Sequence, residues 1–571
     1  MLSNLAMRFT RGRFAAFGAS GADAEALGAM TLPGLKAKPS PVDYTRLLLT
    51  PPCLLPSDPL FAAEYEAGTI ALDGVIARHR GGSIFALAPP SDGWLEALHG
   101  FVWLTHLRAA ETTEARWLAL ALTEEWFETE LPETAWHADV AGRRLLQWLS
   151  HADMLLGNAE PALVHALAQG VAETMARIER GWRALPPGEP QLLPLIALLS
   201  AHLVVPEREA GIDTAEKALM QVLAEAVAPD GMPVSRNAAT IVPLLQDLLA
   251  LKQIYAARGR NVPQTLRALL ATLPDMLQHM RMGDANLARF NGVGPSDPAA
   301  IATLIAQSGS APVSERDTSG GRRELLRGGY ARLAAGAFTV LVDGGNVPDG
   351  MASSHAGALS LVVSYGTDLV FTNQGTDRTD ARAQTAARAS AQHSMLVLGG
   401  TSAATVGPGS DGESTFTRMP KVRAIRKHSM GDDGAGQWPL QYEHDGYVSR
   451  NSLVVERRLR IDEATNELVG LDAVREVMTA RRRTKDNAHR VPFALHFHLG
   501  SRVVVERIGA SEIRLILPNG PALRFSAENH AVGIEPSRIN GTAMGALQSY
   551  QLVVRGLIGH GDAVRWSLKP A

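Results

Sequence analysis

Two histidines at the entrances of expected strands are the residues of this chain best placed for chemistry. His355 follows a loop and precedes the alternating run Leu359–Val363, and His393 opens the run Met395–Leu398. Rigid scaffolds commonly present site residues where a loop enters a strand. The setting predicts that His355 points into a cleft as a site residue, whereas the structural alternative is a histidine that caps its strand.

These histidines lie in the second of two differently patterned halves. From about Gly93 to Gln307, apolar residues recur with helical spacing, which predicts successive amphipathic helices separated by short Pro, Gly or Asp breaks. After a polar linker at 308–324, alternating runs such as AFTVLVD, SLVVSYG and FALHFHLG follow one another without helices between them. This pattern predicts antiparallel sheets packed as a sandwich. We therefore expect a multidomain α+β protein with an N-terminal extension at 1–60, a helical domain at 61–307 and a β-domain at 325–571.

The composition of the chain excludes several functional classes. With 46% hydrophobic residues, 20% charged residues and a net charge of −3, it is an ordinary globular protein without a field that would attract nucleic acid. Cys53 is the only cysteine, so an internal disulfide and a cysteine-based zinc site are excluded. No secretory signal is visible and no run of about 18 apolar residues could insert into a membrane, which predicts a cytoplasmic protein. Motifs of nucleotide-driven enzymes and serine hydrolases are absent.

Four motifs follow one another in the β-half. Gly-Tyr-x-Arg-Leu at Gly329–Leu333 is followed by Asp-Gly-Gly at Asp343–Gly345, Ser-His-Ala-x-x-Leu-Ser at Ser354–Ser360 and Arg-x-x-x-x-His-Ser at Arg388–Ser394. The helical half adds WLEALHGFVWLTHL, RRLLQWLSHADMLL, DGMPVSRNAA and GDANLARFNG. In these motifs the chain resembles the heparinase II/III-like polysaccharide lyases, in a diverged bacterial branch. The resemblance implies an (α/α) toroid followed by an antiparallel β-sandwich.

The chemistry implied by this resemblance is β-elimination from a uronate-containing glycan, either heparin-like or from the bacterial envelope. A base removes the proton at C5, and a donor neutralises the charge that builds on the neighbouring carboxylate. The resemblance points to three catalytic residues: His355 as base or neutralising donor, Asn237 as a contact of the carboxylate, and Tyr330 as the acid that protonates the leaving oxygen. It points to four substrate-binding residues: Arg236, Asn291, Arg289 and Asp284. The expected partner is an acidic polysaccharide or oligosaccharide, and the sequence leaves a homodimer open.

Several of these residues have structural alternatives. Asn237 could cap the first turn of a helix, Asp284 could form a turn, and Tyr330 could pack within a strand. The segment after Asp230 and Gly231, where lyases of the family place a catalytic tyrosine, contains no tyrosine. This departure puts the family's usual elimination chemistry in doubt.

The resemblance also implies a structural zinc in the β-domain, with His355, Asn373 and His393 as its ligands. Asn373 stands in place of the family's usual aspartate, and Gly357 stands in place of the aspartate of its His-Ala-Asp motif. Because the loss of an anionic ligand weakens a zinc site, these departures argue against a tightly held metal. No other cofactor is expected.

Two alternative functions follow from these departures and from the fold class. One is a non-catalytic glycan-binding or envelope-assembly protein that keeps the lyase architecture. The other is a glycoside hydrolase, for which Asp284 would pair with Asp343 or Asp349 across the scissile bond. The family commonly works in the periplasm or cell envelope, so the resemblance and the N-terminal sequence imply different compartments.

Overall fold

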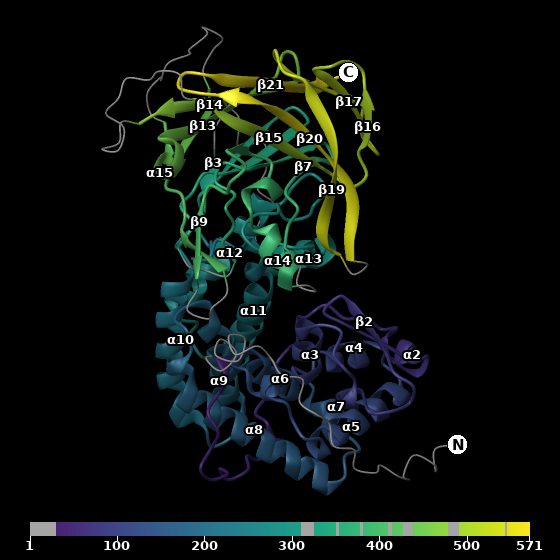
Figure 1. Ribbon diagram of the computed structural model, residues 1–571. Helices are drawn as coiled ribbons and strands as arrows, with labels where there is room; N and C mark the ends of the chain where they lie inside the picture. The colour runs from purple at the N-terminus through teal and green to yellow at the C-terminus, as the bar shows by residue number, and fades with distance from the viewer. Residues whose placement is uncertain are drawn as a thin grey trace.

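The computed structural model describes residues 30–309, 325–349, 353–376, 381–408, 414–425, 438–477, 490–542 and 545–571. Figure 1 shows a helical half formed by the N-terminal part of the chain and a β-half formed by the C-terminal part. The predicted order, helices followed by antiparallel sheets, is confirmed. Among the described residues, no helix has the length and apolarity needed to cross a bilayer.

The helical half is built around one central helix. Its helices are α2 (Phe61–Glu66), α3 (Asp92–His99), α4 (Trp103–Ala109), α5 (Thr113–Glu128), α6 (Ala138–Ser150), α7 (Ala152–Leu156), α8 (Pro161–Gly181), α9 (Leu192–Val204), α10 (Ile212–Ala226), α11 (Ile241–Ala257), α12 (Gln264–Met280) and α13 (Pro298–Ser308). Nearly every side chain of α9 is buried, as its continuous apolar sequence LLPLIALLSAHLV predicts. Helix α9 packs against α6, α8, α10 and α11.

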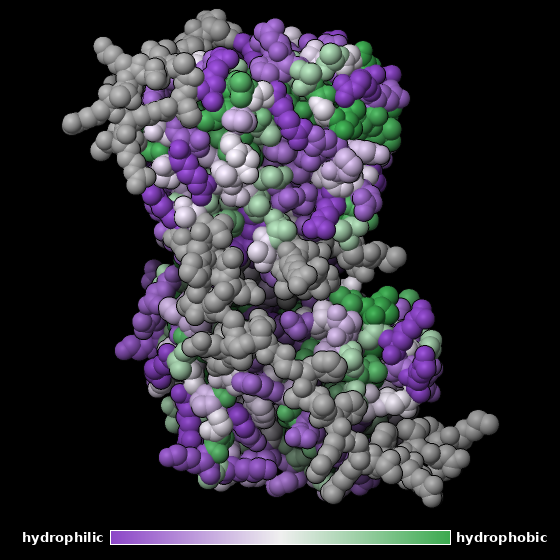
Figure 2. Space-filling model, viewed as in Figure 1, coloured by the Kyte–Doolittle hydropathy of each residue, from purple (hydrophilic) through white to green (hydrophobic). Residues whose placement is uncertain are grey.

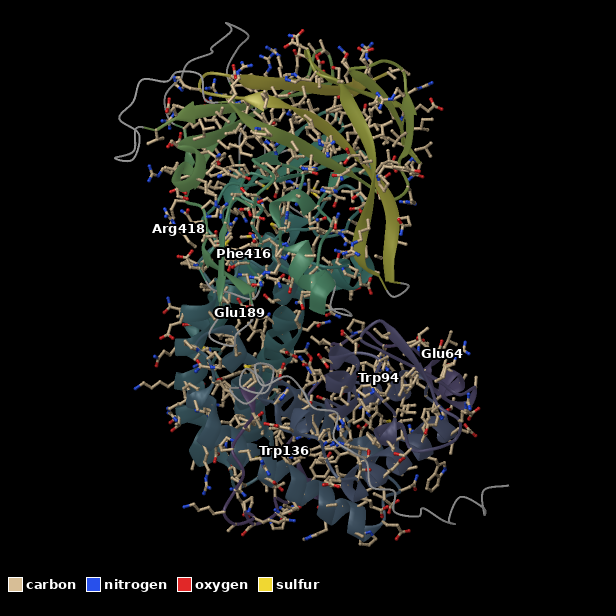
Figure 3. The ribbon with its side chains drawn as sticks, viewed as in Figure 1. Glu64, Trp94, Trp136, Glu189, Phe416 and Arg418 are labelled. Carbon is tan, nitrogen blue, oxygen red and sulfur yellow. The ribbon has the colours of Figure 1, made fainter. Side chains whose placement is uncertain are left out.

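Residues outside these helices complete the helical core. Leu32 and Tyr44 are buried in it, and the Tyr44 hydroxyl donates a hydrogen bond to the carbonyl of Trp148. Strands β1 (Thr69–Leu72) and β2 (Val75–Arg78) form a small hairpin beside Trp94, which is fully buried (Figure 3). In the space-filling view, hydrophobic surface gathers on the helical half near β2, below the indentation that separates the two halves (Figure 2).

The β-half is dominated by two large antiparallel sheets. It also holds the two-stranded sheet of β9 (Thr405–Pro408) and β10 (Ser414–Arg418) and two short helices, α14 (Ala381–Ala387) and α15 (Val448–Asn451), so the expectation of strands without helices between them is wrong at these two points. Among the described residues, one sheet has the order β19-β20-β15-β7-β6-β5-β4-β3, with β8 paired to β15, and the other has the order β11-β12-β13-β14-β21-β18-β17-β16. The strands of the first sheet are β3 (Leu325–Arg327), β4 (Tyr330–Ala335), β5 (Phe338–Asp343), β6 (Leu361–Tyr365), β7 (Asp368–Thr372), β8 (Leu396–Leu398), β15 (Val491–Leu499), β19 (Val532–Thr542) and β20 (Gly545–Ile558). Those of the second are β11 (Val422–Ala424), β12 (Leu440–Tyr447), β13 (Leu453–Asp462), β14 (Glu467–Glu476), β16 (Val504–Arg507), β17 (Glu512–Ile516), β18 (Leu523–Ala527) and β21 (Ala563–Pro570).

Aromatic side chains fill the space between the two sheets. The ring of Phe497 on β15 lies 5.0 Å from Phe371, 5.0 Å from Phe525 and 4.9 Å from Trp566, measured between ring centroids. Such offset and edge-on contacts stabilise a core beyond the apolar area they bury. The first sheet is therefore held firmly on one face, and its strands β4 to β7 carry the loops that meet the helical half.

Candidate active site at the junction of the two halves

One hydrogen-bonded group of side chains, the junction cluster, lies where the helical half meets the β-half. Its members are Arg236, Asn291, Tyr330, Asp343, His355 and His393. The Asn291 amide nitrogen donates to the Tyr330 hydroxyl at 2.8 Å and to an Asp343 carboxylate oxygen at 3.2 Å, and the Asn291 amide oxygen accepts from the His355 backbone N–H at 3.2 Å. The structure thus brings together six residues that the sequence analysis singled out, with Asp343 among them as a carboxylate weighed for a glycoside hydrolase.

Arg236 joins the two halves. Its guanidinium forms an ion pair with Asp343 at 2.7 Å and lies over the ring of Tyr330, 4.2 Å from the centroid. It also donates to three backbone carbonyls of the β-half, at 2.9 to 3.1 Å: Gly328, Gly329 and Gly345. These contacts occupy the guanidinium and bury it, so in this structure Arg236 ties the halves together instead of presenting donors to a substrate.

Tyr330 is sealed inside the same cluster. Its hydroxyl donates to the Arg236 carbonyl at 2.7 Å, and the side chain has no exposed surface. Burial raises the pKa of Tyr330, and the nearby Arg236 cation only partly opposes that rise. The tyrosine therefore stays protonated, with both its donor and its acceptor capacity in use.

His355 and His393 form a directly hydrogen-bonded pair whose tautomers follow from their partners. His393 Nδ1 lies 2.8 Å from the Ala389 carbonyl, which can only accept, so this nitrogen carries the proton. His393 Nε2 then accepts from His355 Nδ1 at 3.0 Å, and His355 Nε2 accepts from the Gly292 N–H at 3.2 Å. Burial lowers the pKa of His393 to about 4, and burial, His393 and Arg388 lower the pKa of His355 well below its usual range. Both rings are neutral, and all four ring nitrogens are engaged.

A buried ion pair in the sandwich fixes the loops that carry these histidines. Arg457 Nε lies 2.7 Å from an Asp472 carboxylate oxygen, and Arg457 Nη1 donates to the carbonyls of Leu359 and Ser394 at 2.8 Å. Both members of the pair are 1% exposed. Sequence reasoning missed this pair, although a charged residue at an inward-facing position of the alternating run NSLVVERRLRID was a usable signal.

Asn237 is the predicted catalytic residue that stays partly exposed beside the cluster. Its side-chain oxygen accepts from the Ala239 N–H at 3.0 Å, so it caps the turn Ala238–Thr240, as the structural alternative predicts. Its amide nitrogen donates to no described residue. This nitrogen lies close to Gly292, since a Cβ atom added to that glycine would be 3.0 Å from it. Asn237 therefore presents a free donor next to the backbone that contacts His355.

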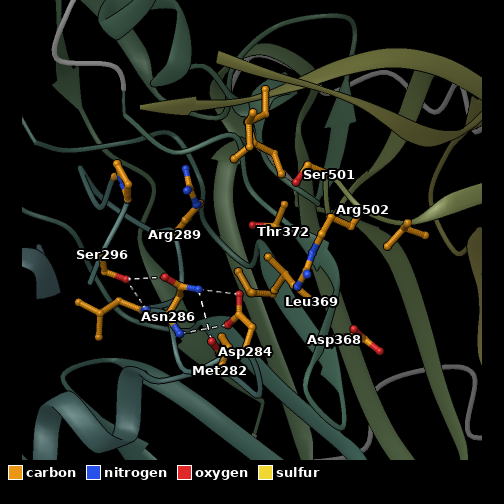
Figure 4. Close-up of a pocket in the computed structure, with 18 of the residues that line it drawn as sticks. Met282, Asp284, Asn286, Arg289, Ser296, Asp368, Leu369, Thr372, Ser501 and Arg502 are labelled. Atoms are coloured by element: carbon orange, nitrogen blue, oxygen red, sulfur yellow. Dashed lines mark hydrogen bonds between the residues drawn. The ribbon is translucent and has the colours of Figure 1, made fainter. Parts of the chain in front are cut away.

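Among the described residues, the side chains of Arg289, Asp284 and Asn373 form no hydrogen bond with the side chains of the junction cluster. Arg289 and Asp284 line a separate cavity of about 220 Å³ (Figure 4). The Asn373 amide donates to the Arg289 carbonyl at 2.8 Å and accepts from the Ser394 N–H at 2.8 Å, so its side chain is held by backbone. Asn373 thereby links the cavity to the loop that carries His393.

The residues expected to hold zinc do not fit a metal. The two histidine nitrogens that face each other, His355 Nδ1 and His393 Nε2, share one hydrogen bond, and the Asn373 oxygen already accepts from backbone. Within the described residues, no three His, Cys, Asp or Glu side chains are grouped as a metal site. The arrangement gives the zinc prediction no support, and no reaction step is derived through a metal.

The three carboxylates considered as catalytic groups of a glycoside hydrolase each bind a different partner in the protein. Asp343 is buried against Arg236, Asp349 accepts from the Met419 N–H at 2.7 Å, and Asp284 accepts from Asn286 in the separate cavity. A hydrolase needs two carboxyl groups flanking one bond. This arrangement does not supply such a pair.

Comparisons with known proteins agree with this architecture. Residues 317–567 match the family model described as heparinase II/III-like, C-terminal. FtsZ-localized protein C of Caulobacter vibrioides (strain NA1000 / CB15N) is 28% identical over 537 residues, which cover 90% of this chain and 89% of that protein. The crystal structure of heparinase III matches with a TM-score of 0.70 at 13% identity, over 96% of this chain and 88% of that one. Heparan sulfate lyase HepC from Pedobacter heparinus matches with a TM-score of 0.55 at 12% identity, over 89% of this chain and 82% of that one.

At these identities the likeness to the solved structures concerns the fold, a helical toroid followed by a β-sandwich, as the sequence predicts. Residues 317–567 thus form a heparinase II/III-like C-terminal domain, and the chain has the fold of heparinase III along 96% of its length.

Proposed function

We propose that this protein binds an acidic polysaccharide on a heparinase scaffold without cleaving it by the elimination reaction of the lyases. The observation that carries the proposal is the state of His355 and Tyr330, the groups that would supply base and acid. Both are buried, and every polar atom of their side chains is hydrogen-bonded to another member of the junction cluster or to the backbone of Gly292. A general base or acid must instead reach the proton that it moves.

Relatives support both parts of this proposal. The lyases with this fold include one that acts on heparan sulfate, an acidic polysaccharide, which favours the same class of ligand here. The relative that matches at 28% identity over most of both chains is known by its localisation with FtsZ. A role in localisation or envelope assembly, with glycan binding retained, accounts for a lyase fold whose reactive groups are occupied.

A lyase is the second candidate, and one observation favours it. The hydrogen bond to His393 keeps the proton of His355 on its Nδ1, so His355 Nε2 carries a lone pair. The side-chain amide of Asn237 lies close to Gly292, whose N–H contacts this Nε2. If Gly292 moved aside, His355 would take the C5 proton while Asn237 donated to the uronate carboxylate. The electron pair would form the C4–C5 double bond, and the C4–O bond to the leaving sugar would break. The leaving oxygen would take its proton from solvent.

Incubation with heparin, heparan sulfate, hyaluronan, alginate and bacterial envelope glycans is expected to give binding without product. Binding is measured by calorimetry, and elimination by the ultraviolet absorbance of the unsaturated uronate. Asn237→Ser keeps a helix-capping oxygen but removes the amide donor, so we expect it to weaken binding by about 1 kcal/mol, the usual contribution of one hydrogen bond.

Each other outcome decides between the candidates. A rise in absorbance with wild type that His355→Ala abolishes would establish the lyase and contradict binding without cleavage. No binding and no absorbance change with any of these glycans would contradict both candidates. His355→Gln serves as a matched control for folding, because its amide can retain part of the hydrogen bonding of the ring.

A further inference from the structure

A cavity apart from the junction cluster carries groups that no step above has used. Its volume is about 220 Å³, and it lies between the 282–296 segment that follows α12, strands β6 and β7, the 500–503 turn after β15, and the β19–β20 hairpin. Figure 4 shows polar side chains entering it from opposite walls. Pockets for drug-sized ligands are typically roughly 300–1,000 Å³, so this one suits a ligand of about one sugar unit.

Arg289 brings a partly uncommitted guanidinium to this cavity. Its Nη1 donates to the carbonyl of Asn540 at 2.7 Å and to that of Gln374 at 3.4 Å. Its Nε and Nη2 donate to no residue that the structure describes. Burial lowers the pKa of Arg289 to about 10, whereas Asp284 favours its charge. A cation that burial destabilises is stabilised when an anion binds beside it.

Arg502 supplies a second cation. Its side chain is exposed, lines the same cavity and forms no hydrogen bond or ion pair with a described residue. In Figure 4 it extends from the 500–503 turn past Leu369 into the cavity. Asp368 also lines the cavity, where its two oxygens accept from Asn519 at 2.9 and 3.1 Å, and it forms no ion pair with Arg502 among the described residues.

The opposite wall suits hydroxyl groups. The Asn286 amide donates to an Asp284 carboxylate oxygen at 2.9 Å, and the Ser296 hydroxyl donates to the Asn286 oxygen at 3.2 Å (Figure 4). These bonds fix the orientation of the Asp284 carboxylate while leaving it lone pairs for further donors. Apolar side chains complete the lining and suit the carbon face of a sugar ring: Leu287, Val362, Leu369, Val503, Ile539 and Leu547.

We propose that this cavity is a subsite for one carboxylate-bearing sugar unit of an acidic glycan. Arg289 and Arg502 bind the carboxylate, since guanidinium donors pair with it in charge-assisted hydrogen bonds, and Asp284 accepts from ring hydroxyls. The proposal rests on the proposed function as a binder of acidic polysaccharide. It adds the chemical class of the unit that is recognised and a place for it outside the junction cluster.

Free glucuronate is the probe, with glucose as the neutral comparison, and binding to the full chain is measured by calorimetry and by ligand-observed NMR. We expect wild type to bind glucuronate in preference to glucose, and Arg502→Gln to weaken glucuronate binding about tenfold or more, the effect of a lost charge-assisted hydrogen bond. Arg514→Gln is the matched control, because Arg514 is exposed on β17, outside this cavity, and should leave the affinity unchanged. Arg289→Gln should also weaken binding, but Arg289 holds two backbone carbonyls, so Arg502→Gln is the decisive variant.

The outcomes separate this subsite from the proposed function. Equal affinity of wild type and Arg502→Gln for glucuronate, or no preference for glucuronate over glucose, overturns the subsite even if the long glycans bind. Glucuronate binding that depends on Arg502, combined with no binding of any long glycan, supports the subsite and overturns the polysaccharide-binding function.

Discussion

Replacing Arg236 with methionine is expected to lower the free energy of unfolding by about 3–5 kcal/mol. The substitution keeps the length of the side chain but leaves the Asp343 carboxylate buried without its cation, and it removes donors from three backbone carbonyls. An uncompensated buried charge is among the most destabilising changes that one substitution can make. Urea denaturation followed by circular dichroism and by tryptophan fluorescence measures the loss.

Two further variants show whether the loss comes from the buried charge. Arg108 forms a two-pronged ion pair with Asp153 on the surface, with about half of both side chains exposed, so Arg108→Met should cost less than about 1 kcal/mol. Adding Asp343→Asn to Arg236→Met should recover part of the stability, since the remaining partner is then neutral. A loss below about 1 kcal/mol for Arg236→Met would show that the junction does not depend on this pair.

The same contacts support the proposal that the junction cluster does not serve as a reaction site. An active site usually leaves some of its polar groups without hydrogen-bond partners until the substrate binds, and this lowers the stability of the fold. Here the Tyr330 hydroxyl donates to the Arg236 carbonyl, and the Arg236 guanidinium donates to backbone carbonyls of the β-half. Asn237 is the exception, since its amide nitrogen has no acceptor among the described residues and its side chain is half-buried.

The sequence allowed the two halves to be predicted because each rests on a local period. The helical spacing and the strand alternation change between Ser308, which ends α13, and Leu325, which begins β3. The β1–β2 hairpin inside the helical half was not predicted, although Asp73-Gly74 between apolar residues is a strong hairpin signal. The order of strands lies beyond such reasoning, because β15 pairs with β7 across more than a hundred residues of chain and periodicity carries no information about that contact.

The cluster was only partly predictable for a related reason. Residue type and position in a motif pointed to His355, Asn291 and Tyr330, and these residues do come together. Their states depend on partners that lie far away in the sequence. The position of the proton on His355 is set by its hydrogen bond with His393. The guanidinium donors of Arg236 are taken up by glycine carbonyls of the β-half, which no pattern in the sequence identifies as acceptors.

Acidification between pH 6.5 and about 4 is expected to destabilise the protein steeply, because buried histidines are held neutral in the folded state. Burial lowers the pKa of several of them to about 4: His99, His151, His279, His393 and His444. In the unfolded chain a histidine has a pKa near 6.5, so within this window the unfolded state binds more protons and stability falls as the pH falls. Each such histidine contributes roughly 1.4 kcal/mol per pH unit, and the loss levels off once the pH is below the folded pKa values.

Denaturation midpoints measured at intervals from pH 7.5 to 4.5 test this expectation, and the His355–His393 pair allows the contribution of the junction cluster to be isolated. The double variant His355→Gln, His393→Asn cannot take up protons at these positions, so its free energy of unfolding should fall less steeply with acidification than that of wild type, by up to roughly 2.8 kcal/mol per pH unit. The variant is expected to be less stable at neutral pH, since the pair's hydrogen bonds are altered, but only the slope reports the protons. Equal slopes for the two proteins would mean that neither ring gains a proton on unfolding, so that both rings bind protons in the fold as they do in the unfolded chain. That result would contradict the neutral tautomers on which binding without cleavage, and the lyase alternative, both depend.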